Sequence, residues 1–116
     1  MKDETIKDKF GMVQMSETVI EAIAGLAATE INGVKSLAGG IVHNEITRSD
    51  GKNLNRAVRV ALQDGKIAIK LALILDGTVS VPEVARTLQE KVKNSVEIMT
   101  GNEVTSVDLV VTGVEP

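Results

Sequence analysis

The segment that most restricts the fold is residues 56–77, RAVRVALQDGKIAIKLALILDG. Two runs of alternating apolar and polar residues flank Asp64-Gly65, and this dipeptide in such a setting is the strongest short-range signal for a β-hairpin with a type I′ turn. A two-residue loop pairs Gln63 with Lys66. The resulting register gives six apolar side chains one shared face, which we expect to be the core face: Val58, Val60, Leu62, Ile67, Ile69 and Leu71.

The other face of this hairpin is small and basic, with Ala57, Arg59, Ala61, Ala68, Lys70 and Ala72. The register makes Arg59 and Lys70 direct cross-strand neighbours, which is slightly destabilising, and places Lys66 at the tip. Lysines often serve only to keep an exposed sheet soluble. The functional alternative is a surface for an acidic partner, a nucleic-acid backbone or another subunit. Arg59, Lys66 and Lys70 are therefore our candidate interaction residues.

Two helices are indicated by their caps and periodicity. Ser16 is a good N-cap, and apolar spacing predicts a helix over residues 17–31 that Asn32-Gly33 ends. Ser80 and Glu83 form a capping-box pattern that starts a second helix within residues 80–101, ended by Gly101. The second helix has one apolar stripe, made of Val81, Val84, Ala85, Leu88, Val92, Val96 and Met99.

The first helix is rich in small residues, including Ala24 and Ala28. We expect these residues to pack closely on the sheet. The alternative is a contact between helices of two subunits.

Short strands are expected at 11–16 and 104–114, around the two helices and the hairpin. This order predicts an α+β fold, a two-layer sandwich of the split βαβ type. Its mainly antiparallel sheet would have three to four strands, with two helices on one face. The 116 residues predict one domain, residues 11–116, after a flexible tail at residues 1–10. Residues 35–55 lack a sustained period and are expected to form a variable loop.

Composition excludes several kinds of chemistry. The chain has no cysteine, which rules out disulfides, thiol nucleophiles and thiolate metal sites. It has no Trp or Tyr and a single Phe, Phe10, so platforms for stacking bases are missing. The net charge of −3 also disfavours nucleic acid as a partner. Its longest apolar run, interrupted by Lys70, is too short to span a bilayer, so membrane association would need a partner.

Residues 39–53, GGIVHNEITRSDGKN, are the one stretch with a combination suited to catalysis. They contain the only histidine, His43, near Glu45, Ser49 and Asp50. Catalysis by histidine needs a fixed carboxylate and usually a nucleophile. No periodic pattern fixes such a geometry here, so we interpret the stretch as a solvated loop. With one histidine and scattered acids, neither a metal site nor a cofactor is expected, and the chain is not expected to be an enzyme.

Several segments together resemble a known family. They are GMVQMSETVIEAIA at 11–24, NGVKSL at 32–37, the hairpin, VPEVARTLQEKVKNSVEIMTG at 81–101 and VTSVDLVVTGV at 104–114. This ordered set is similar to the alkaline-shock and general-stress proteins of Gram-positive bacteria, the envelope stress response proteins. The resemblance covers nearly the whole chain, and its most specific part is Met99-Thr100-Gly101 with the strand that follows.

The resemblance implies a non-enzymatic interaction or scaffold protein in the cell-envelope response to alkaline stress. It implies a cytoplasmic protein held at the inner face of the membrane by a small membrane-anchored partner, and a homo-oligomer. No catalytic residues carry over from this family. The alternative function is a small RNA-binding α+β module, against which stand the missing aromatic residues and the acidic balance.

Overall fold

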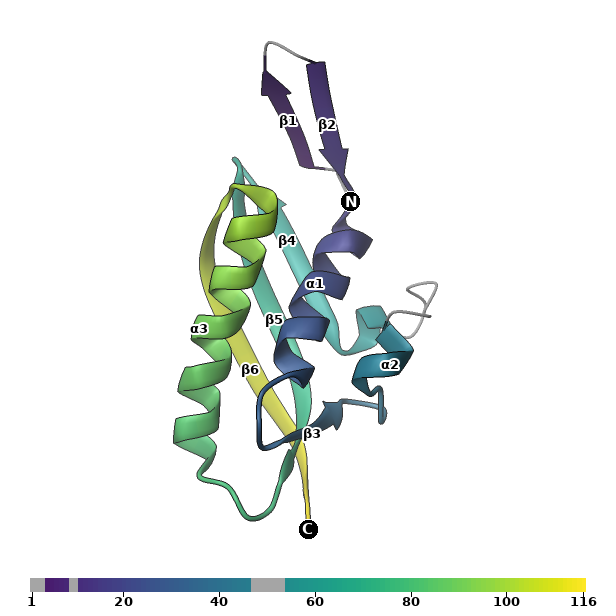
Figure 1. Ribbon diagram of the computed structural model, residues 1–116, viewed down its shortest axis with the longest axis vertical. Coiled ribbons are helices and arrows are strands. Elements are labelled where there is room, and N and C mark those ends of the chain that lie inside the picture. Colours follow the sequence, from purple (N-terminus) through teal and green to yellow (C-terminus); the bar gives the residue numbers. More distant parts are fainter. Residues whose placement is uncertain (1–3, 9–10, 47–53) are drawn as a thin grey trace.

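The computed structural model describes residues 4–8, 11–46 and 54–116 (Figure 1). In chain order, the N-terminal half contains β1 (Glu4–Asp8), β2 (Gly11–Met15), α1 (Glu17–Thr29), β3 (Val34–Leu37), the short α2 (His43–Ile46) and a 3₁₀ turn at Leu54–Arg56. The C-terminal half contains β4 (Val58–Gln63), β5 (Lys66–Asp76), α3 (Val81–Thr100) and β6 (Glu103–Glu115). The predicted α+β class is confirmed.

The main sheet has four strands and is organised around β5. On one side, β4 and β3 pair with successive parts of β5, both antiparallel. On the other side, β6 runs parallel to β5 along its whole length. The sheet is therefore mainly antiparallel, as expected. The strands β5 and β6 are direct neighbours, however, so the βαβ unit that they form with α3 is not split by an intervening strand.

The hairpin register follows the sequence prediction at every position. Gln63 pairs with Lys66, and the pairing continues to Val58 with Leu71. Asp64 and Gly65 have φ angles of 53° and 73°, the left-handed values that a type I′ turn requires. The six apolar residues of the predicted core face are buried, with Leu62 partly so.

Two bulges in β6 keep it in register with β5. The pairing slips between Ile67 and Ala68 and again between Leu73 and Ile74. At each slip a threonine of β6 donates a hydrogen bond from its hydroxyl to a β5 carbonyl, Thr105 to Ile67 at 3.2 Å and Thr112 to Leu73 at 3.1 Å. These hydroxyls satisfy acceptors next to the irregular positions.

The caps mostly agree with the sequence. The hydroxyl of Ser16 accepts a hydrogen bond from the Val19 amide at 3.3 Å, and α1 ends two residues earlier than predicted. Gly101 caps α3 with a φ of 74°, and its amide donates to the Glu97 carbonyl. The capping box at Ser80 is not formed, since its side chain makes no capping hydrogen bond.

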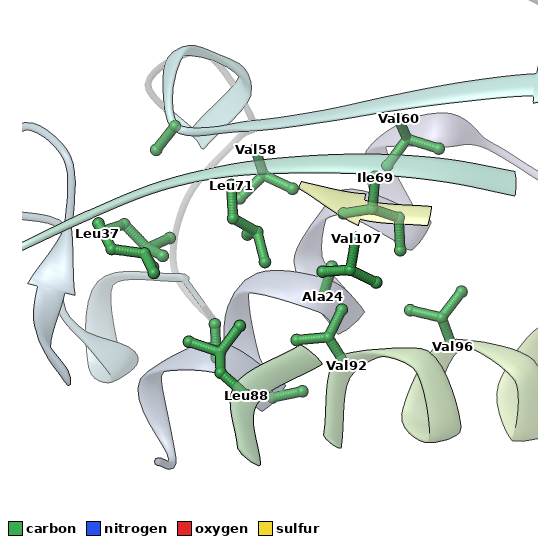
Figure 2. Close-up of a cluster of buried hydrophobic side chains, with 14 of the residues drawn as sticks. Ala24, Leu37, Val58, Val60, Ile69, Leu71, Leu88, Val92, Val96 and Val107 are labelled. Carbon is green, nitrogen blue, oxygen red and sulfur yellow. The ribbon is translucent and has the colours of Figure 1, made fainter. Parts of the chain in front are cut away.

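The helices α1 and α3 lie side by side on one face of the sheet, and the core fills the space between the layers (Figure 1). Figure 2 shows Ala24 of α1, Leu88 and Val92 of α3, and Ile69 and Leu71 of the sheet converging there. Two positions of the apolar stripe predicted for α3 do not join the core: Met99 is 60% exposed and Val81 is also exposed. They lie at the two ends of α3.

The N-terminal segment differs most from expectation. Residues 4–8, expected within a flexible tail, form β1, which pairs with β2 in an antiparallel two-stranded sheet. The strand β2 therefore belongs to this small hairpin and not to the main sheet. Figure 1 shows the hairpin extending beyond the end of the main body, along the long axis of a molecule measuring 51 × 27 × 19 Å.

Leu88 is 0% exposed beneath α3, so we expect Leu88→Ala to lower the free energy of unfolding by about 2–5 kcal/mol through the cavity it leaves. Ile98→Ala is the matched control, because Ile98 lies on the same helix but is 81% exposed. Urea denaturation of both variants measures the difference. Equal stability of the two variants would mean that the assigned core face of α3 is wrong.

Candidate interaction surface

The face of the main sheet opposite the helices is open in the part of the chain that the structure describes. Arg59, Ala61 and Lys70 are exposed there, and Ala68 and Ala72 are partly exposed. Ala57 is a correction to the predicted surface: it is only 2% exposed, and its carbonyl accepts a hydrogen bond from the Ala72 amide. The open face thus carries small side chains beside its charged residues.

The charged residues of this face change sign from one edge of the sheet to the other. Arg59 is the register neighbour of Lys70, as predicted, and on the other side Lys70 neighbours Asp108 of β6. Lys66, at the hairpin end, likewise neighbours Glu103. The lysines therefore have acidic neighbours that offset the repulsion expected from the hairpin alone. Such a mixed surface suits a protein partner better than a phosphate backbone.

The small-residue face of α1 is not available for a contact between subunits. Ala24 and Ala28 are fully buried within the core. Of the two predicted roles for these residues, close packing inside the molecule is confirmed.

The stretch considered for catalysis is only partly described. His43 is the first residue of α2, where it and Glu45 are exposed to solvent. Ser49 and Asp50 lie outside the described residues. Within residues 4–8, 11–46 and 54–116, no group of three or more His, Cys, Asp or Glu is arranged to hold a metal ion. No helix among these residues is long and apolar enough to cross a membrane.

A pocket that sequence analysis missed lies where the start of α1 meets the edge of the sheet at β4. It has a volume of about 410 Å³ and is lined by Ser16, Glu17, Thr18, Glu21, Asn55, Arg59 and Val60. Glu17 and Glu21 are only 8% and 4% exposed. The sequence held one signal for this pocket. Glu17 and Glu21 are four residues apart and therefore share one side of α1, and Glu21 directly follows Ile20, a residue of the core.

The environment of Glu21 disfavours its charge. Burial is the main cause that raises the pKa of its carboxyl above the ordinary value of 4.5, and the neighbouring Glu17 raises this pKa further. The positive charge of Arg59 acts in the opposite direction. Arg59 sits on β4, an edge strand of the sheet, and so lines this pocket in addition to bordering the open face.

These observations define a class of protein: a small α+β domain with one layer of helices, an open sheet face of mixed charge and an acidic pocket at the edge. Comparison with known proteins then identifies the family. Residues 5–116 match the model of the alkaline shock protein family, which is described as having a cell envelope-related function. The chain belongs to this family.

Relatives of the chain are found in Bacillus and Streptococcus. It is 30% identical to the uncharacterized protein YqhY of Bacillus subtilis over 90% of this chain and 78% of YqhY. It is 32% identical to the uncharacterized protein YloU of the same organism, over 94% of this chain and 92% of YloU. The uncharacterized protein Spy1614 of Streptococcus pyogenes is 31% identical over 83% and 81% of the two chains. No solved structure matches the chain.

We expect Glu21→Gln to stabilise the isolated protein at neutral pH. Because the pKa of Glu21 is raised on folding, the folded state binds more protons than the unfolded state above pH 4.5. The stability that this group contributes is complete below that pH and is lost as the pH rises through the raised pKa. The gain from Glu21→Gln should therefore be largest at neutral pH and shrink on acidification.

Thermal unfolding across a pH series measures this difference. Glu90→Gln is the control, because Glu90 is exposed on α3 and the same neutralisation there should change little. A Glu21→Gln variant that is less stable than the parent at neutral pH would contradict the assigned environment.

Proposed function

We propose that this chain is a non-enzymatic interaction protein of the cell-envelope stress response. It acts at the cytoplasmic face of the membrane by binding a small membrane-anchored protein and further copies of itself. The family's envelope-related function supports the cellular setting. The membrane-anchored partner rests on the resemblance to the envelope stress proteins, and self-association rests on the open sheet face.

The observation that carries the proposal is the order of charges across the open face. From β4 through β5 to β6, the neighbouring residues are Arg59, Lys70 and Asp108. Consider a second copy related by a two-fold axis that runs parallel to the strands above this face. The axis places β4 of each copy over β6 of the other, so Arg59 faces Asp108 of the second copy, twice. A surface with this order is self-complementary, as a symmetric dimer requires.

The small side chains of the face allow the two sheets to approach closely. Ala61, Ala68 and Ala72 leave no bulk between the charged residues, and Val110 of β6 adds an exposed apolar side chain at the register position of Ala72. The contact thus combines small side chains with charged pairs at its sides. Lys70 of each copy lies near the axis and keeps Asp108 of its own chain as a neighbour.

We expect Asp108→Lys to weaken self-association by about tenfold or more, because it replaces both attractive pairs with repulsive ones. Glu90→Lys is the matched control, since it makes the same change of charge on the exposed side of α3. Sedimentation equilibrium of the parent and both variants, over a series of salt concentrations, measures the effect.

Association of the parent should weaken as salt increases, because exposed charge pairs are screened. A parent that stays monomeric at high protein concentration, or an Asp108→Lys variant that associates like the parent, would overturn the proposed sheet interface. Arg59 is a poor choice for this test, since a change there also alters the acidic pocket.

A further inference from the structure

The outer edge of β6 changes character halfway along the strand, and its first half is covered by α3. The amide of Val104 donates a hydrogen bond to the Glu97 carboxylate at 2.9 Å, and the Val104 carbonyl accepts one from the Lys93 ammonium at 3.4 Å. The Val107 carbonyl accepts a hydrogen bond from the side-chain amide of Gln89 at 3.0 Å. These side chains occupy the edge, so a further strand cannot pair with it here.

The second half of this edge has no such cover among the described residues. Backbone groups alternate between the two sides of a strand, and the register with β5 does not shift between Val107 and Val111. The amides and carbonyls of Leu109 and Val111 therefore point away from β5, as the Val107 carbonyl does. No strand pairs with β6 on this side in the part of the chain that the structure describes. An unpaired edge of this kind is a template for another strand.

The sequence of α3 accounts for the change along the edge. Residues four apart lie on one side of a helix, and Gln89, Lys93 and Glu97 form such a row facing β6. Toward the start of α3 the row continues with Ala85 and Val81, whose side chains have no hydrogen-bonding group. The helix therefore covers the edge where its row is polar and leaves the edge free where its row is apolar.

An apolar groove lies beside the free half of the edge. It has a volume of about 340 Å³, and Val81 and Ala85 of α3 and Leu109 and Val111 of β6 are among the residues that line it. Val81 and Val111 are 40% and 39% exposed. Recognition by strand addition uses this combination, since the edge supplies main-chain hydrogen bonds and the groove takes alternate side chains of the added strand.

The N-terminal hairpin has the complementary property, because it is a pair of strands without a larger sheet. Among the described strands, β1 and β2 pair only with each other. Met15, at the base of β2, is packed against the core, and Figure 1 shows the rest of the hairpin extending away from the body. A lone two-stranded hairpin is only marginally stable in water, and further strands stabilise it. The five residues of β2 carry no charge, and neither do residues 109–114 of β6.

The positions of the two segments decide which copy supplies the strand. The hairpin and the C-terminal end of β6 lie at opposite ends of a molecule 51 Å long (Figure 1). The hairpin therefore cannot reach the free edge of its own chain, but the hairpin of a second copy can. We propose that β2 of one copy adds to residues 109–114 of β6 in the next copy. The two surfaces differ, so the contact joins copies head to tail into an open chain. It gives the proposed self-association a second contact that does not depend on the open sheet face.

Val111→Lys tests the edge, because a charge that points into the groove opposes an added strand. Sedimentation equilibrium is measured in roughly 1 M NaCl, where a Debye length of about 3 Å screens the charge pairs of the open face. The parent should still associate there, and Val111→Lys should weaken the association by about tenfold or more. Ile98→Lys is the matched control, since Ile98 is 81% exposed on α3. Val111→Pro is a second variant, which removes the edge amide and leaves the pairing with β5 intact.

Mixing two variants tests the head-to-tail order. Val13→Pro disrupts β2 at the residue paired with Ile6 and keeps the edge of β6, whereas Val111→Lys keeps the hairpin and loses the edge. Each variant alone should be monomeric in high salt. Their mixture should form a one-to-one dimer that grows no further, because one intact hairpin meets one intact edge. A symmetric contact cannot give this result.

A parent that is monomeric in high salt, a Val111→Lys variant that associates like Ile98→Lys, or a mixture that stays monomeric would overturn the edge contact. Association at low salt that responds to Asp108→Lys but not to Val111→Lys would also overturn it, and would leave the open-face contact standing. Self-association of Val13→Pro as strong as that of the parent would show that another segment occupies the edge, which overturns the role of the hairpin.

Discussion

The structure depends on the pairing of β5 on both of its sides. This 11-residue strand pairs with β4 and β3 along one edge and with β6 along the other. Every second side chain of β5, from Ile67 to Leu75, is buried against the helices. The period of two in this strand fixes the core face for its neighbours, because a slip of one residue would turn the whole apolar set toward solvent.

Having helices on only one side of this sheet produces both candidate surfaces. The layer of α1 and α3 buries one face and leaves the other open (Figure 1). Because β4 is an edge strand, α1 packs against the border of the sheet and leaves a pocket between its first turns and Arg59. The pocket is buried enough to raise the pKa of Glu21, whereas the open face keeps its charges in water. A change of one charge therefore has a larger electrostatic effect in the buried pocket than on the open face.

Local signals in the sequence were sufficient for the hairpin and most of the helix boundaries, but not for contacts between distant segments. Asp64-Gly65 and the flanking alternation determine the register without reference to the rest of the chain. The parallel pairing of β6 with β5 and the two bulges in β6 join segments that carry no mutual signal. The same limit applies to function: only the packing of α1 on β4 shows that Glu17 is buried and lines a pocket with Glu21 and Arg59.

Arg59 links the acidic pocket to the open face through its place on the edge strand. By register it belongs to the row that includes Lys70 and Asp108, yet its charge also lowers the pKa of Glu21. In the proposed dimer, Asp108 of a second copy would compete with Glu21 for the same guanidinium. Any such coupling is reciprocal: self-association would raise the pKa of Glu21, and protonation of Glu21 would favour self-association to the same extent.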